Sequence, residues 1–191
     1  MSISERIQFL RAYLRNPHTV GSVTPSSRYL ARALTEHISP SVSCVAELGP
    51  GTGPVTRAIL ERGGPATSVV AFESEPLLCA WLQRAVVDPR LRILNAPAEE
   101  LLAHLTELHL KPGTVVSSLP FGNFSLPLRQ TIVNAAYLAL VPGGTFVGFS
   151  YGSANLRTTL GQVFGNCQTR RVVRNLPPAL VFTARKSTTG R

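Results

Sequence analysis

The chain has 191 residues, of which 44% are hydrophobic and 15% are charged. This length suffices for one well-filled domain, and this composition excludes a disordered tail. Lysine and arginine outnumber aspartate and glutamate by 19 to 10, a formal net charge of +9 that indicates a polyanionic partner, either nucleic acid or an anionic membrane surface.

Cysteine usage and hydropathy narrow the class of protein further. Cys44, Cys79 and Cys167 stand alone without a CxxC pair, which predicts structural thiols in a reducing cytoplasm and no metal site. No apolar run approaches the roughly 20 residues that cross a bilayer, and the N-terminus lacks the apolar block of a secretory signal. We therefore expect a cytoplasmic protein that is soluble or bound to a surface.

Two helices are predicted within a separate N-terminal segment, residues 1–40. Between Ile3 and Leu14 apolar residues recur at intervals of four, three and four, with arginines beside them. This pattern over 3–15 fits an interfacial helix in the head-group layer of a membrane, and it fits a helix packed on its own domain equally well. The second helix is predicted over 25–38, as a lid over substrate and cofactor.

Strands and helices alternate through residues 41–191, which predicts one α/β domain with a mostly parallel sheet covered on both faces. The last pair of predicted strands is separated by the short link Leu176-Pro177-Pro178, which permits only an antiparallel return. The predicted strands cover 44–48, 67–72, 91–94, 113–117, 145–151, 169–175 and 180–185. One predicted helix follows the glycine-rich turn and ends at residue 62. Three others cover 76–87, 98–110 and 126–140.

The glycine-rich stretch VAELGPGTG follows the first predicted strand. Gly49, Gly51 and Gly53 have no Cβ, so the backbone can take positive φ and approach a ligand closely. A turn of this kind at the carboxyl end of a strand is a site for nucleotide-like ligands. Glu47 disfavours a pyrophosphate there and suits a cationic group such as an α-amino group.

Polar residues also follow the next two predicted strands. Glu73, with Ser74 after it, can accept hydrogen bonds from ribose hydroxyls. The Asn95-Ala96 pair ends the third strand, where a side-chain amide can reach an adenine edge. A ligand with amino acid, ribose and adenine parts fits all these positions, and S-adenosylmethionine is that ligand.

The stretch ELGPGTG, the acid Glu73 and the stretch SSLPF at 117–121 resemble the class I S-adenosylmethionine-dependent methyltransferases. The resemblance covers roughly 42–186 and implies a Rossmann-like domain with a seven-stranded, mostly parallel sheet and a C-terminal antiparallel strand pair. The cofactor-binding residues that it implies are Glu47, Gly49, Gly51, Gly53, Glu73, Ser74, Asn95, Ala96 and Ser117.

A narrower resemblance lies outside the cofactor stretch. Residues 20–31, 115–121, 149–151 and 175–179 are similar to the bacterial phospholipid N-methyltransferases, which methylate phosphatidylethanolamine toward phosphatidylcholine. Related branches act on other aminolipids such as ornithine lipids, and the stretch FGNF at 121–124 is only loosely like the family, which leaves the head group open. We expect a phospholipid substrate and a location at the inner face of the cell membrane. The expected substrate-binding residues are Ser26, Ser27, Arg28, Phe121 and Phe124.

Methyl transfer to an amine is an in-line displacement, so it needs an aligned, neutral amine rather than a strong base. The expected positioning groups are Ser117 and Ser118, through backbone or hydroxyl, with Tyr29 and Tyr151 beside the amine. Aromatic faces there would favour a methylated ammonium by cation–π attraction. Each tyrosine could equally be a packing residue.

Two other functions remain open. Ribosomal RNA adenine N6-methyltransferases have a similar glycine stretch, and the basic charge suits RNA. Their Asn/Asp-Leu/Pro-Pro-Tyr/Phe motif is here SLPF at 118–121, without the Asn, and we expect no helical RNA-binding domain after the strand at 180–185, so nucleic acid is not the expected partner. The second alternative is a membrane-bound regulator that binds the cofactor without catalysis.

Overall fold

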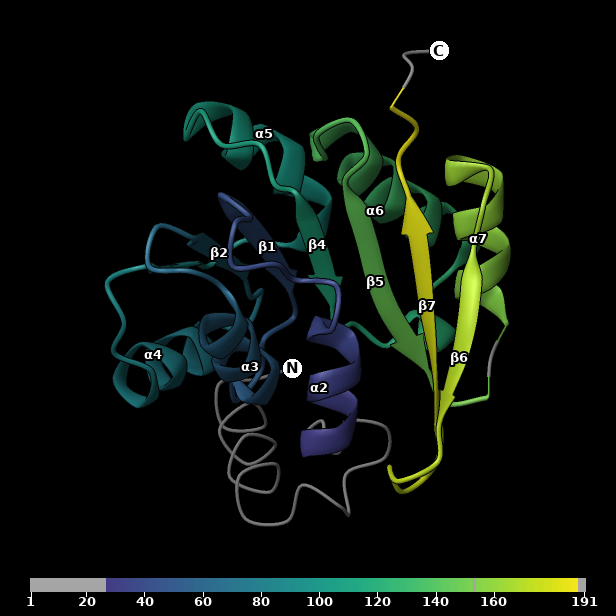
Figure 1. Cartoon of the computed structure of the whole chain (residues 1–191), viewed down its shortest axis with the longest axis horizontal. Helices are drawn as coiled ribbons and strands as arrows, with labels where there is room; N and C mark the ends of the chain where they lie inside the picture. The colour runs from purple at the N-terminus through teal and green to yellow at the C-terminus, as the bar shows by residue number, and fades with distance from the viewer. Residues whose placement is uncertain (1–26, 153, 189–191) are drawn as a thin grey trace.

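The computed structural model describes residues 27–152 and 154–188 (Figure 1). The predicted interfacial helix over 3–15 and the candidate Ser26 lie outside these residues. The strands are β1 (Cys44–Leu48), β2 (Ser68–Phe72), β3 (Leu91–Leu94), β4 (Thr114–Ser117), β5 (Thr145–Ser150), β6 (Gln168–Val172) and β7 (Ala179–Arg185). The helices are α2 (Arg28–Thr35), α3 (Pro54–Arg62), α4 (Pro76–Ala85), α5 (Leu101–Glu107), α6 (Leu126–Ala139) and α7 (Asn155–Phe164), with 3₁₀ turns η1 (Ala98–Glu100) and η2 (Phe121–Asn123).

All seven strands form one sheet in the order β3-β2-β1-β4-β5-β7-β6. The first five strands are parallel, and β7 runs antiparallel to both β5 and β6. This confirms the predicted seven-stranded sheet with its C-terminal antiparallel pair. Leu48 pairs with Phe72 of β2 and with Ser117 of β4, so the parallel strands end together at one edge, here called the carboxyl edge.

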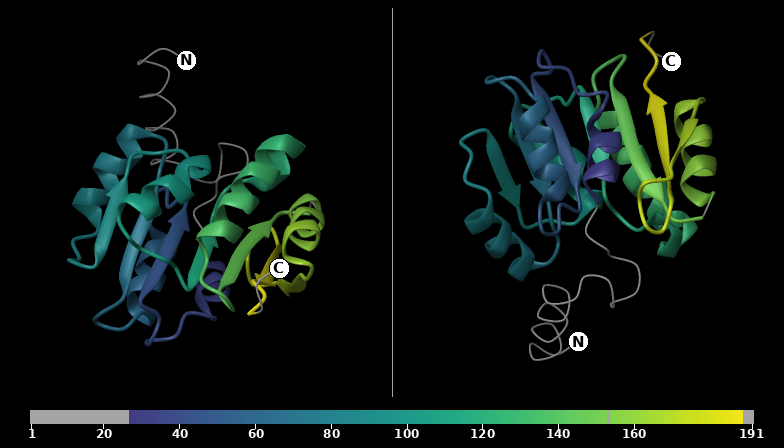
Figure 2. Two further views of the ribbon diagram at one scale, coloured as in Figure 1. Left: turned by 90° about the horizontal axis from the view of Figure 1, so that it is seen from above. Right: turned by 60° about the horizontal axis from the view of Figure 1, so that its bottom comes forward.

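Helices cover both faces of the sheet (Figures 1 and 2). On one face α2 and α3 bury Leu30, Leu34 and Ile59 against valines of the central strands. On the other face α5, α6 and α7 enclose a larger cluster that contains Phe146 and Phe182. Strand residues alternate between these two clusters, because successive side chains of a strand point to opposite faces.

Helix α2 is a member of this layered domain. Ser27 caps its first turn, since the Ser27 Oγ accepts the N–H of Leu30 at 3.2 Å, and the inner face of the helix packs in the core. Its start lies at the same end of the molecule as the carboxyl edge (Figures 1 and 2). The predicted lid role, and a domain boundary at residue 40, stay predictions.

The sequence pattern predicts no element between 151 and 169, whereas the structure has α7 there. The predicted strand over 169–175 ends earlier, at Val172, because the chain turns at 173–178. Among the residues described, no helix combines the length and the apolar character of a membrane span.

Candidate cofactor and substrate site

The turn after β1 requires glycine. Gly49, Gly51 and Gly53 have φ values of 69°, 55° and 84°, which L-residues with a side chain rarely adopt. At Gly49 a Cβ would also lie 2.7 Å from the Cδ2 atom of Leu119, which follows β4. The turn at the carboxyl edge is therefore bare backbone packed closely against the next loop.

Glu73 fastens this turn to the end of β2. One oxygen of its carboxylate accepts the N–H of Gly51 at 3.1 Å, and the other accepts the N–H of Glu75 at 3.0 Å. Burial raises the pKa of Glu73, and the bonds from the Glu75 and Gly51 backbone oppose the rise. Glu73 is only 7% exposed, so its carboxylate, which is the predicted acceptor for ribose hydroxyls, is fixed in one position beside the glycine turn.

Glu47 is fully buried beneath the same turn. Neither of its carboxylate oxygens has a hydrogen-bond partner among the residues described. Burial raises its pKa to about 8; the Thr56 hydroxyl opposes the rise without reaching the geometry of a hydrogen bond, and the charge of Glu73 adds to it. A buried carboxyl without a partner costs free energy unless a cation is supplied, and an α-amino group bound at the turn would supply one.

The remaining predicted cofactor residues surround Glu73. The Nδ2 of Asn95 donates to the backbone carbonyl of Glu73 at 2.9 Å, so one of its amide hydrogens supports the loop. Asn95 and Ser74 are exposed at the carboxyl edge, whereas the Ala96 side chain is buried. The structure thus brings the predicted amino acid and ribose positions together and leaves Asn95 accessible beside them.

The two serines after β4 differ in what their hydroxyls do. Ser117 is fully buried, and its Oγ accepts the N–H of Leu119 at 3.3 Å, so this hydroxyl closes the turn. The N–H of Ser118 donates to the carbonyl of Leu48 at 2.8 Å, while its buried Oγ lacks a partner within the described part of the chain. Of the two hydroxyls, that of Ser118 is therefore the one without a partner in that part of the chain, and that of Ser117 is already used within the turn.

Phe121 is a core residue, which corrects its prediction as a substrate-binding side chain. The 3₁₀ turn η2 folds its ring inward until it is fully buried, 5.7 Å from the ring of Phe124 and 6.3 Å from that of Phe146. Phe124 is partly buried and remains a candidate.

A second polar cluster joins α2, the end of β5 and the turn between β6 and β7. Its centre is Asn175, 3% exposed, whose Oδ1 accepts the Ser27 hydroxyl at 2.6 Å. Its Nδ2 donates to the carbonyl of Pro177 at 2.7 Å and to the Tyr151 hydroxyl at 3.4 Å. Asn175 is not among the predicted site residues, although it begins the stretch NLPPA at 175–179.

Two guanidinium groups lie over the ring of Tyr29. The Arg28 guanidinium donates to the Tyr29 hydroxyl at 2.9 Å and lies 4.9 Å from the ring centre, and the Arg174 guanidinium lies 5.8 Å from it. The bond from Arg28 lowers the pKa of the Tyr29 hydroxyl. A methylated ammonium at this ring would meet two positive charges, so the prediction that Tyr29 lies beside the amine is corrected. Tyr151 remains the aromatic candidate.

Comparison with known proteins agrees with this geometry. An ornithine lipid N-methyltransferase from Singulisphaera acidiphila is 26% identical over 180 residues, which are 93% of this chain and 94% of that protein. Ribosomal RNA small subunit methyltransferase A from Mycobacterium bovis is 36% identical over 89 residues, which are 44% of this chain and 26% of that protein. No family model matches the chain.

Among solved structures, the 16S rRNA N2 G1207 methyltransferase of Thermus thermophilus, in complex with AdoMet and guanosine, has a TM-score of 0.67 and 28% identity. The match covers 88% of this chain and 45% of that one, so the chain spans less than half the length of this solved structure. The strand order, the glycine turn and these similarities identify the chain as a class I S-adenosylmethionine-dependent methyltransferase.

Proposed function

We propose that the protein methylates the amine of a membrane aminolipid at the inner face of the cell membrane. The observation that supports this most is the similarity to an ornithine lipid N-methyltransferase, because it extends over nearly the whole of both chains. The matches to ribosomal RNA small subunit methyltransferase A cover less than half of this chain. The match to the 16S rRNA methyltransferase of Thermus thermophilus covers 88% of this chain but only 45% of that one. Ornithine lipid and phosphatidylethanolamine both present a primary amine, and both are candidate substrates.

The cofactor would be held between the two buried acids. Glu47 offers a negative charge to an α-amino group, Glu73 offers acceptors to ribose hydroxyls, and Asn95 lies at the adenine end. When bound, S-adenosylmethionine supplies an electrophilic methyl group on a sulfonium centre. The residues of the chain then have to deliver the amine along the line of the departing sulfur.

Ser118 and Tyr151 are the groups that we assign to this delivery. The partnerless Ser118 hydroxyl can accept a hydrogen from the amine and orient its lone pair. Asn175 donates to the Tyr151 hydroxyl at 3.4 Å, and the ring of Phe149 packs edge-on against the Tyr151 ring at 5.2 Å, which keeps that ring in place. Methyl transfer beside Ser118 and Tyr151 needs no strong base, because water can take the proton of the ammonium before the amine attacks the methyl group.

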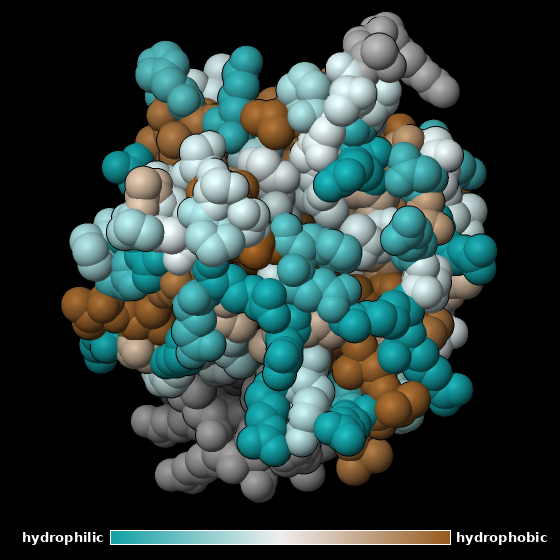
Figure 3. All heavy atoms as spheres, in the orientation of Figure 1, coloured by the Kyte–Doolittle hydropathy of each residue, from teal (hydrophilic) through white to brown (hydrophobic). Residues whose placement is uncertain are grey.

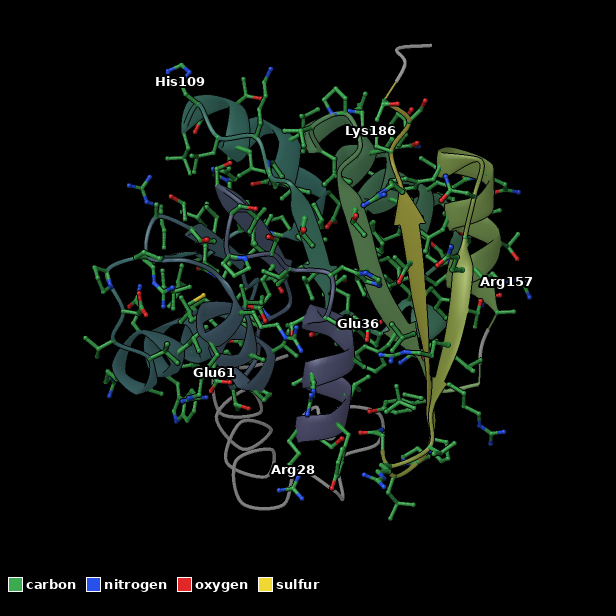
Figure 4. All side chains as sticks on the ribbon, in the orientation of Figure 1. Arg28, Glu36, Glu61, His109, Arg157 and Lys186 are labelled. Atoms are coloured by element: carbon green, nitrogen blue, oxygen red, sulfur yellow. The ribbon has the colours of Figure 1, made fainter. Side chains whose placement is uncertain are left out.

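The lipid phosphate or carboxylate would lie near the start of α2. Ser27 caps this helix start, and Arg28 points away from its lower end in Figure 4. Helix N-termini and guanidinium groups both attract anions. This assignment keeps the predicted substrate role of Ser27 and Arg28, with Phe124 on the opposite loop.

The test is a transfer assay with radiolabelled S-adenosylmethionine and three acceptors offered separately: ornithine lipid, phosphatidylethanolamine and ribosomal RNA. Label in either lipid supports the proposal, and the ratio between the lipids identifies the head group. Label in RNA alone would establish the alternative, an rRNA methyltransferase. Cofactor binding without any transfer would indicate the non-catalytic regulator.

A further inference from the structure

We propose that the turn between β6 and β7 is a membrane-docking surface that inserts into an anionic bilayer and brings the carboxyl edge against it. This inference rests on the proposed function for its biological sense, but its test does not depend on catalysis. The docking surface consists of Arg28, Tyr29, Arg171, Val173, Arg174 and Leu176.

The tip of this turn exposes apolar side chains that the fold does not need. Leu176 is 86% exposed and Val173 is 68% exposed, which makes them two of the most exposed large hydrophobic residues described. Figure 3 shows hydrophobic atoms beside strongly hydrophilic ones at the lower right, over this turn. Two aliphatic side chains at the end of a protruding hairpin can enter the boundary between head groups and acyl chains without unfolding anything.

The tip is held in place from within. The buried Asn175 lies between Val173 and Leu176 and bonds to the Ser27 hydroxyl, the Pro177 carbonyl and Tyr151. Because these bonds fix Asn175, the fold also fixes the exposed positions of Val173 and Leu176 beside it. A preorganised tip loses little conformational entropy on insertion, which favours binding.

Arginines surround the apolar tip. A groove of about 450 Å³ between α2 and β6 is lined by five arginines and one glutamate. Only one of the five, Arg170, has an acidic partner in the described structure, since it pairs with Glu36 at 2.8 Å. The unneutralised arginines provide the charge that anionic lipid head groups attract.

The docking surface lies next to the candidate substrate site. Arg174 and Arg28 stack on the same ring of Tyr29, and Asn175 bonds to the catalytic candidate Tyr151. Arg28 lies at the end of α2 nearest to the β6–β7 turn (Figures 1 and 4). A bilayer that covers the tip would therefore face the entrance through which a lipid head group must pass.

The same arginines could attract RNA, but the apolar tip argues for a bilayer. Proteins that bind single-stranded RNA stack bases on aromatic faces or guanidinium planes, and phosphate contacts use polar groups. Exposed aliphatic side chains contribute to neither. The only aromatic ring of the docking surface, Tyr29, is already stacked by two guanidiniums.

The experiment measures flotation of the full chain with two kinds of vesicle, one of phosphatidylethanolamine with phosphatidylglycerol and one of phosphatidylcholine alone. We expect binding to the anionic vesicles only. The double variant Val173→Asp/Leu176→Asp and the double variant Arg171→Gln/Arg174→Gln should each lower the partition coefficient at least about tenfold. The matched controls are Leu138→Asp, an exposed leucine of α6 near Lys186, and Arg92→Gln, an exposed arginine on the opposite edge strand β3; both should bind as the unmodified chain does.

Methyl transfer to a short-chain aminolipid dispersed in neutral detergent separates docking from catalysis. The four docking-surface substitutions should leave this activity within about twofold, because none of them contacts the proposed reacting groups. Thermal unfolding of each variant verifies that the fold is intact. Unchanged flotation of both double variants would overturn the docking proposal, as would binding to RNA with no binding to vesicles. Vesicle binding without any transfer to lipid would overturn the proposed function but would still support the docking surface.

Discussion

Replacing Glu47 by Gln should make the free protein more stable at alkaline pH while it weakens cofactor binding. The Glu47 carboxyl is fully buried without a hydrogen-bond partner among the described residues, and burial raises its pKa from 4.5 to about 8. A shift of this size means that ionised Glu47 costs folding about 5 kcal/mol. An uncharged Gln of the same shape removes this cost, although its own unpaired amide costs about 1–3 kcal/mol.

The sign of the pH dependence follows from these values. Below the unfolded pKa of 4.5 both states carry a neutral carboxyl, so ionisation has no cost, and the variant should be less stable than the parent chain by the roughly 1–3 kcal/mol of its unpaired amide. As pH rises from 4.5 to about 8, the unfolded state ionises first, and the stability of the parent chain falls. At pH 9 the variant should be more stable by about 2–4 kcal/mol. Urea denaturation at pH 5, 7 and 9 measures this difference, with Glu99→Gln, an exposed glutamate, as the control.

Cofactor binding gives an independent readout of the same carboxyl. At pH 6.5 Glu47 is protonated in the free protein, and an ammonium brought to the glycine turn should ionise it. Calorimetric titration with S-adenosylmethionine in buffers of different ionisation enthalpy should therefore report release of about one proton, and none for Glu47→Gln. Affinity of the variant at pH 8 should be lower by about tenfold or more. Equal proton release by both proteins, or a variant that loses stability at pH 9, would refute the reasoning.

Three further substitutions test other parts of the site. Glu73→Ala removes the acceptor of two backbone N–H groups and should cost about 1–3 kcal/mol in urea denaturation and lower cofactor affinity about tenfold in calorimetry; an unchanged affinity would contradict its assignment. Gly49→Ala forces a side chain against Leu119 at positive φ, so it should lower the stability measured by thermal unfolding by about 1–3 kcal/mol. Its control is Gly161→Ala, inside α7 with open space around it, which should raise the stability by up to about 1 kcal/mol. Asn175→Ala removes the centre of a buried cluster and should cost about 1–3 kcal/mol and reduce transfer to lipid more than cofactor affinity; an equal loss in both assays would refute a substrate-side role.

The strands of the sheet could be predicted because they are short apolar runs bounded by glycine, proline and polar residues. Helix α7 could not, because Thr158, Thr159 and Gly161 are poor helix formers and the residue before the helix, Ala154, provides no side-chain cap. The helix exists because Leu156 and Leu160 are fully buried against the sheet. Tertiary packing therefore overrode local preference at this position.

The grouping of glycines and acids at the carboxyl edge could also be predicted, since such residues at strand ends have a local chemical meaning. The substrate side depends on contacts between residues that are far apart in the chain. Ser27 and Asn175 are 148 positions apart, yet they form one hydrogen bond, and Arg174 reaches the ring of Tyr29 in the same way. No local pattern distinguishes a ring stacked by two arginines from a free one. The inward rotation of Phe121 in its 3₁₀ turn is hidden for the same reason.

The close approach of Gly49 to Leu119 has a consequence for the order of events in a catalytic cycle. Leu119 fills the space that a side chain at position 49 would need, and Ser118 is hydrogen-bonded to Leu48, so the two loops move together or not at all. A ligand that shifts one loop would therefore shift the other and change the affinity there, and by thermodynamic reciprocity the effect would be the same in both directions. If the substrate is the proposed lipid, we expect it to bind synergistically with the cofactor, each raising the affinity of the enzyme for the other by the same factor.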